Sequence, residues 1–303
     1  MEKVYFKTAE LLTAIFLGYA LKRSGHLSPQ DTQTISKLVL WITLPCVIVK
    51  SLSGITLGQE LAFAAAIGAA ANGALLLMTW LCFGRRDSQG WMAALFSVTT
   101  FNISSFAVPV LAPFISAETM AGVLAFNLPT SIFTYAIVPS CAALRSETSE
   151  HSWRQAGKKL LHSIPTMTCL VMFALAALHI SLPQAVVAIA GSFAGANTFL
   201  AMLAVGSLMS FSFSNEGLQL LPPIMARLGT VCVLAVLIRL LPIRSDLCSA
   251  LIMSVFAPAA STMPVLALQS GYRGGSVAVT NSVYLLILSL IHISEPTRPE
   301  PIS

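Results

Sequence analysis

Long apolar stretches alternate along the chain with short segments that contain charged residues, glycine or proline. An α-helix needs about 17–25 predominantly apolar residues to cross the hydrocarbon core of a bilayer, and most of the stretches have about that length. The pattern therefore predicts an all-α membrane protein with many spans. The ten predicted spans lie at residues 5–21, 37–53, 61–83, 91–114, 119–144, 160–178, 187–211, 219–241, 247–269 and 276–293.

The longest hydrophilic connection, residues 145–159, divides the predicted helices into two groups of five, within residues 1–144 and 160–303. Because five is an odd number, the second group enters the membrane from the opposite side, and the two groups form an inverted repeat. A short match supports this interpretation. The residues Pro-Val-Leu-Ala at 109–112 recur at 264–267, in the corresponding helix of the second group.

The composition excludes a water-soluble protein. Only 10% of the residues are charged, 56% are hydrophobic and the mean hydropathy is +0.81, whereas a soluble domain carries about 25% charged residues. The cations are scattered between apolar stretches and form no basic stripe with interleaved aromatics, so nucleic acid is not an expected partner.

The distribution of cations predicts the orientation. Ten lie on the side of the membrane that includes residues 145–159 and five on the other, which places this loop in the cytoplasm and the N-terminus outside. The expected location of the protein is the plasma membrane. The ten are Lys22, Arg23, Lys37, Arg85, Arg86, Arg145, Arg154, Lys158, Lys159 and Arg273, and the five are Lys3, Lys7, Lys50, Arg239 and Arg244.

The end of the chain has a different character. Residues 288–299, LSLIHISEPTRP, resemble a translated sequencing adapter and no protein family. We therefore expect the residues after about 288 to be foreign, and the tenth helix to be truncated.

Two predicted spans, 91–114 and 247–269, carry polar residues and proline in their middle, and we expect them to be non-helical near Asn102–Pro109 and Pro258–Pro264. Proline removes a backbone donor and clashes with the preceding turn, and irregular backbone survives in a membrane only inside protein or beside a water-filled cavity. Interrupted helices at matching places in two repeats indicate a transporter binding site. The candidate substrate-binding residues are Asn102, Ser104, Ser105, Pro109, Asn127, Pro258, Ser261, Thr262 and Pro264.

Span 119–144 adds polar residues that could line the same cavity: Asn127, Pro129, Thr130, Ser131 and Tyr135. The alternative interpretation is structural. Kinks of this kind often only shape helix packing, and each polar side chain on span 119–144 could instead make an interhelical hydrogen bond, which is worth about 0.6 kcal/mol on average.

Charged residues are nearly absent from the middle of the predicted spans. No Asp or Glu lies in the middle of any span, so the paired carboxylates of a proton or sodium relay are not predicted. Arg227 lies in span 219–241 near one end, from which its side chain is expected to reach the interface. The six cysteines form no CxxC or Cys/His pattern, and no nucleophile–base pair or phosphate loop occurs. We therefore expect no metal, no cofactor and no enzyme activity.

Several segments resemble the auxin efflux carrier family in its bacterial form. They are residues 17–28 (LGYALKRSGHLS), 36–39 (SKLV), the Leu-Pro at 44–45, the Phe-Asn at 101–102 with FAVP at 106–109, and APA at 257–259 with PVLA at 264–267. The resemblance implies ten helices in two inverted repeats, with broken helices four and nine crossing at the substrate site. It also implies a frequent homodimer and small organic anions, such as auxin or malonate, as substrates. Ser104 and Ser105 depart from the family, because many members have glycine there.

The expected function is a secondary transporter that exports small carboxylates by alternating access. Two alternatives remain open. A sodium-coupled symporter of the bile-acid type has a similar architecture but needs additional ion-coordinating polar residues around the crossing. A receptor or assembly subunit that transports nothing would keep the helices without needing two matched breaks.

Overall fold

The computed structural model describes residues 2–55, 57–145, 161–208, 217–274, 276–277, 279–280 and 283–284. All regular structure in this part of the chain is helical. Most of the predicted cytoplasmic loop at 145–159, most of the predicted tenth span and the whole adapter-like tail lie outside the described residues.

The helices follow the apolar stretches of the sequence. In the first half they are α1 Glu2–Arg23, α2 Pro29–Leu38, η1 Val39–Thr43, α3 Leu44–Leu52, α4 Gln59–Phe83, α5 Ser88–Val98, η2 Ile103–Ala107, α6 Val108–Leu111, α7 Ala117–Ile132, η3 Phe133–Ile137 and α8 Val138–Ala143. In the second half they are α10 Ile164–Ala177, α11 Gln184–Ala194, α12 Asn197–Leu208, α13 Gly217–Arg239, α14 Ser245–Phe256 and α15 Met263–Gln269.

Six helical stretches of the described chain are long and apolar enough to cross a membrane. They are Pro29–Leu52, Gln59–Phe83, Ser88–Leu111, Ala117–Ala143, Gln184–Leu208 and Leu221–Arg239. Helices α10 and α14 are apolar but shorter. The described part of the chain is therefore all-helical, with the long apolar helices of a multi-pass membrane protein. The finer prediction of ten spans stays a prediction.

Three π-helical turns stand directly before prolines. The turns η1, η2 and η3 end at Thr43, Ala107 and Ile137, and the second residue after each is a proline: Pro45, Pro109 and Pro139. A proline inside a helix has no N–H to donate and its ring clashes with the carbonyl of the preceding turn. Widening that turn relieves the clash while most backbone groups stay bonded within the helix, as a membrane requires.

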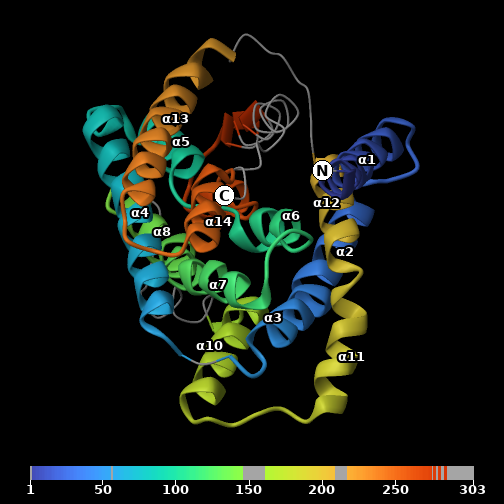
Figure 1. Cartoon of the computed structure of the whole chain (residues 1–303). Coiled ribbons are helices and arrows are strands. Elements are labelled where there is room, and N and C mark those ends of the chain that lie inside the picture. Colours follow the sequence, from blue (N-terminus) through green and yellow to red (C-terminus); the bar gives the residue numbers. More distant parts are fainter. Residues whose placement is uncertain are drawn as a thin grey trace.

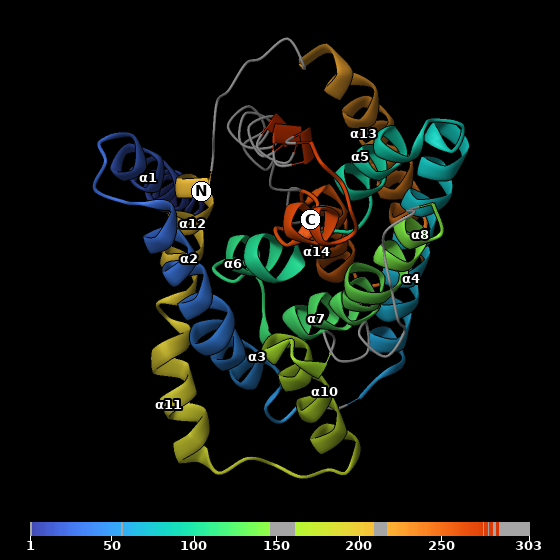
Figure 2. The ribbon, with the colours of Figure 1, turned by 180° about the vertical axis from the view of Figure 1, so that it is seen from behind.

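The helices form two bundles. Figure 1 shows α1, α2, α3, α11 and α12 along one side, which we call the first bundle. On the other side lie α4, α5, α8 and α13. We call these four helices, together with α7, α14 and α15, the second bundle. Figure 2 shows the same division from behind. In the first bundle α1 packs on α12 and α3 on α11, and in the second α4 packs on α7 and α13 on α14. Each bundle therefore draws helices from both halves of the sequence.

Two of the three proline-containing stretches of the first half lie inside the protein. In the most apolar 18 residues of Ser88–Leu111, 78% of the residues are buried, and in those of Ala117–Ala143 the share is 67%. The corresponding share in Gln59–Phe83 and in Gln184–Leu208 is only 28%. Helices α4 and α11 thus leave much of their apolar surface free to face lipid, while the two interior stretches are enclosed by protein. Enclosure is the condition under which interrupted backbone is tolerated in a membrane.

Helix α4 packs against α7 through a glycine. A methyl group at Gly68 would meet the carbonyl oxygen of Phe126 at 2.5 Å, whereas one at Gly73, on the same helix, meets no atom within 4 Å. We expect Gly68→Ala to lower the free energy of unfolding by about 1–3 kcal/mol, because backbone cannot yield as a side chain does. Gly73→Ala is the matched control and should leave the melting temperature unchanged or raised, since alanine favours helix. Equal melting temperatures for both variants in detergent would contradict this packing.

Candidate functional site

The first helix interruption separates α5 from η2. Helix α5 ends at Val98, and the chain is not helical again until Ile103. Thr100 has a φ of 66°, a left-handed conformation that a β-branched residue adopts only under strain. The sequence placed this break at 102–109, and the structure places it earlier, at Thr99–Asn102. The π-helical turn before Pro109 explains the difference, because it accommodates the proline without interrupting the helix.

The second interruption separates α14 from α15. Helix α14 ends at Phe256 and α15 begins at Met263, in agreement with the predicted break at 258–264. The two interruptions touch each other, since the backbone N–H of Asn102 donates to the carbonyl of Pro258 at 2.7 Å. Non-helical segments about 150 residues apart in sequence thus share a hydrogen bond.

A buried arginine holds both interruptions. Arg227, from α13, is 1% exposed. Its guanidinium donates to the carbonyls of Val98, Thr100 (2.9 Å) and Ala257 (2.7 Å). The sequence-based expectation that this side chain reaches the membrane interface is wrong. The hydropathy pattern indicates how deep a residue lies in a helix but does not identify its hydrogen-bond partners. In the structure, free carbonyls at two helix ends solvate the charge of the Arg227 guanidinium, so its side chain does not need to reach the interface.

A cavity lies beside the two interruptions. Its volume is about 50 Å³, room for about four waters or the head of one carboxylate. None of its described lining residues carries a charged side chain. The lining residues are Leu40, Phe101, Asn102, Ile103, Ser104, Ser105, Asn127, Thr130, Ser131, Thr134, Tyr135, Ser163, Pro165, Thr166, Ala260, Ser261 and Thr262.

Asn102 has a double role in this cavity. Its side-chain oxygen accepts a hydrogen bond from the backbone N–H of Ser105 at 3.3 Å and so caps the start of η2. The assignment of oxygen and nitrogen follows from this bond, because only the oxygen can accept from an N–H. The amide nitrogen is therefore left to donate, in a residue that is 8% exposed and lines the cavity.

The other polar side chains around the cavity are linked to one another. The Asn127 amide donates to the hydroxyl of Ser104 at 3.0 Å, and the Ser131 hydroxyl donates to the carbonyl of Asn127 at 3.1 Å. The Thr166 hydroxyl, at the start of α10, donates to that of Ser131 at 3.2 Å. This chain of bonds fixes the side chains in place, as a binding site needs.

The structure brings six of the nine candidate site residues to the cavity: Asn102, Ser104, Ser105, Asn127, Ser261 and Thr262. The three prolines are not in its described lining. Pro258 holds Asn102 through its carbonyl, the carbonyl of Pro109 accepts from the Thr198 hydroxyl at 3.2 Å, and Pro264 is the second residue of α15. Of the residues suggested on span 119–144, Thr130, Ser131 and Tyr135 line the cavity and Pro129 does not.

Sequence reasoning missed the contributions of α10 and η1. Ser163, Pro165 and Thr166 stand at the start of α10, where a polar residue ahead of a proline is an ordinary helix start. Leu40 comes from an apolar turn. Neither pattern distinguishes a cavity wall from a helix end, so sequence alone offered no signal for these residues.

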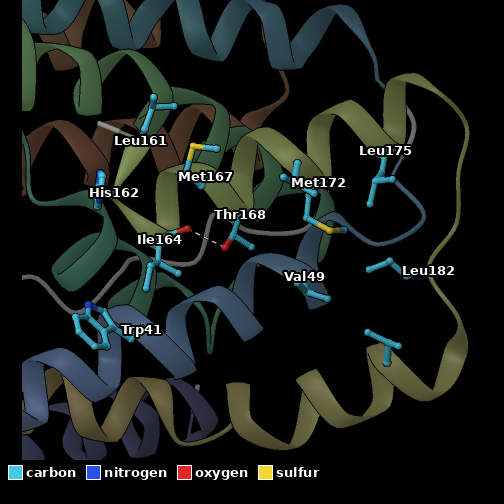
Figure 3. Close-up of a pocket in the computed structure, with 12 residues that line it drawn as sticks. Trp41, Val49, Leu161, His162, Ile164, Met167, Thr168, Met172, Leu175 and Leu182 are labelled. Carbon is cyan, nitrogen blue, oxygen red and sulfur yellow. Dashed lines mark hydrogen bonds between the residues drawn. The ribbon is translucent and has the colours of Figure 1, made fainter. Parts of the chain in front are cut away.

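A larger hollow lies elsewhere and has a different character. It has a volume of about 720 Å³ and lies between α10, α3 and α11 (Figure 3). Its lining is mostly apolar, with Trp41, Val49 and Met172 among its walls, and the Thr168 hydroxyl donates to the Ile164 carbonyl of its own helix (2.8 Å). Such a surface suits hydrocarbon and offers little to orient a polar solute.

Fold and site together define a multi-pass, all-helical membrane protein in which two interrupted helices meet beside a small polar cavity. The chain matches no protein-family model and has no significant match among curated proteins.

Proposed function

We propose that the chain is a secondary transporter that carries small organic carboxylates out of the cell across the plasma membrane by alternating access. The observation that carries the proposal is the hydrogen bond from Asn102 to Pro258, which joins two helix interruptions beside a polar cavity. Interrupted helices that meet in this way typify the substrate sites of secondary transporters. The resemblance to the auxin efflux carrier family supports the same class of protein and the same class of substrate.

The chemistry of the cavity supports a carboxylate. Its walls offer neutral donors, namely the Asn102 amide and several hydroxyl groups. Neutral donors can hold an anion and release it again, whereas a contacting cation would bind it tightly and resist release. The carboxylate group is the part of the substrate that fits the cavity of about 50 Å³. A larger substrate requires the cavity to widen.

The position of the cavity supports alternating access. Leu40 belongs to a turn that continues into α3 of the first bundle, while Asn127 and Ser261 belong to segments of the second. Movement of one bundle against the other would therefore open the cavity to either side. The repeated Pro-Val-Leu-Ala sequence supports two inverted repeats, because Pro109 and Pro264 both lie in the helical segments that follow the two interruptions, in α6 and α15.

Ligand-induced thermal stabilisation tests the substrate class. A ligand that binds only the folded protein stabilises it by about 2.7 kcal/mol at one hundred times its Kd. We expect small carboxylates in a panel to raise the melting temperature in detergent and their neutral amides to leave it unchanged. The proposal fails if amides stabilise as well as carboxylates, or if no carboxylate does. A shift that appears only with Na⁺ would instead favour the sodium-coupled symporter.

A further inference from the structure

The charge of Arg227 is close to the cavity but separated from it. The guanidinium carbon lies 5.3 Å from the centre of the Phe101 ring and 5.0 Å from that of Tyr284. Phe101 lines the cavity and Arg227 does not. Arg227 therefore lies behind the Phe101 wall, where it acts on the contents of the cavity through its field and not by contact.

The field of Arg227 opposes that of two helix ends. Its three acceptors, the carbonyls of Val98, Thr100 and Ala257, stand at the carboxyl ends of α5 and α14. Each such end carries about −0.5 elementary charge, and two together would repel an anion from the cavity. The single positive charge of Arg227 offsets both ends. Among the described residues no carboxylate forms an ion pair with Arg227, so this charge is not cancelled elsewhere.

We infer that Arg227 sets the charge selectivity of the cavity, as a positioning residue that does not touch the substrate. The inference rests on the proposed function for its biological meaning, but the field it describes is a property of the structure alone. A unit charge about 10 Å away, in an effective dielectric of about 20, changes the local concentration of a monovalent anion about tenfold. Arg227 thereby makes the cavity accept carboxylates without a cation in its wall.

The test measures the potential at the cavity without any substrate. Ser261 is exposed, lines the cavity and follows Ala257 by four residues. A cysteine placed there, in a chain whose native cysteines are replaced, is modified with an anionic and with a cationic methanethiosulfonate. The ratio of the two rates, normalised to a free thiol in solution, reports the local potential. A change in thiol reactivity alone alters both rates and cancels in the ratio.

Four variants separate charge from structure. We expect Arg227→Gln to lower the anionic-to-cationic ratio about a hundredfold, because losing the charge slows the anionic reagent about tenfold and speeds the cationic one by the same factor. Arg227→Lys, which keeps the charge, should preserve the ratio. Tyr284→Glu places a carboxylate beside the guanidinium while leaving its three hydrogen bonds in place, and should lower the ratio by a similar factor. Tyr284→Gln is the matched control and should preserve the ratio.

The outcomes distinguish this inference from the proposed function. An unchanged ratio in Tyr284→Glu overturns the inference, and this variant decides the matter even if Arg227→Gln does not fold. A ratio that falls as expected, in a protein that binds no carboxylate, sustains the role of Arg227 and rejects carboxylate transport. Carboxylate binding with an unchanged ratio supports the proposed function and rejects the role of Arg227.

Discussion

Replacing Arg227 with methionine is expected to lower the free energy of unfolding by about 3–5 kcal/mol, more than either Gly68→Ala or Asn102→Ala should. Methionine fills much of the same volume but donates no hydrogen bond. The carbonyls of Val98, Thr100 and Ala257 would lose their donor in a site where the arginine is 1% exposed. A buried acceptor without a partner costs about 1–3 kcal/mol, and three are affected.

The measurement is the melting temperature in detergent, which should fall by about 10 °C for a loss of this size. Arg239→Met is the matched control, because Arg239 lies on the same helix with an exposed side chain. Its melting temperature should stay within about 2 °C of the wild-type value. If Arg227→Met melts like the control, the arginine does not hold the two interruptions together.

Replacing Asn102 with aspartate is expected to abolish most carboxylate binding while preserving the fold. Aspartate keeps the oxygen that accepts from Ser105 N–H and caps η2. It loses the amide N–H donor of a residue that lines the cavity and adds a negative charge. A hydrogen bond to a charged group contributes about 1.5–3 kcal/mol, so affinity should fall about tenfold to a hundredfold from the lost donor alone, and further from repulsion.

Asn102→Ala completes the comparison. It removes the cap as well as the donor, so it should lose affinity and also about 0.5–2 kcal/mol of stability. Asn197→Asp is the control, because Asn197 is buried and bonded to Thr43 and neither residue lines the cavity, so the affinity of this variant for carboxylates should be unchanged. Affinity and melting temperature are measured for all three variants. If Asn102→Asp binds carboxylates with wild-type affinity, Asn102 has a structural role and does not bind the substrate.

The sequence predicted those features that depend on local chemistry. Hydrophobic length placed the helices, and the polar residues and prolines of spans 91–114 and 247–269 identified the two stretches that are interrupted. Proline chemistry alone, however, placed the first break too far along the chain. The structure accommodates Pro109 with a π-helical turn and puts the break at Thr100, a residue with no sequence signal for a left-handed conformation.

The features that depend on packing between distant segments were not predictable. Arg227 is one positive residue in an apolar helix, and nothing near it in sequence shows that carbonyls from α5 and α14 surround it. Thr166 reaches the cavity only because the start of α10 packs beside Ser131. A single sequence records residue types and spacing, whereas the partners of a buried polar group are set by the packing of the whole chain.

Counterflow in proteoliposomes tests the central claim most directly. Vesicles that contain the protein are loaded with an unlabelled carboxylate, and entry of the labelled compound is followed with and without a membrane potential. We predict saturable counterflow of a carboxylate but not of its neutral amide, a response to potential of about 2.3 kcal/mol per charge per 100 mV, and loss of counterflow in Asn102→Asp. Counterflow that is equal for carboxylate and amide, or that survives Asn102→Asp unchanged, would contradict the assignment of the helix crossing as a carboxylate transport site.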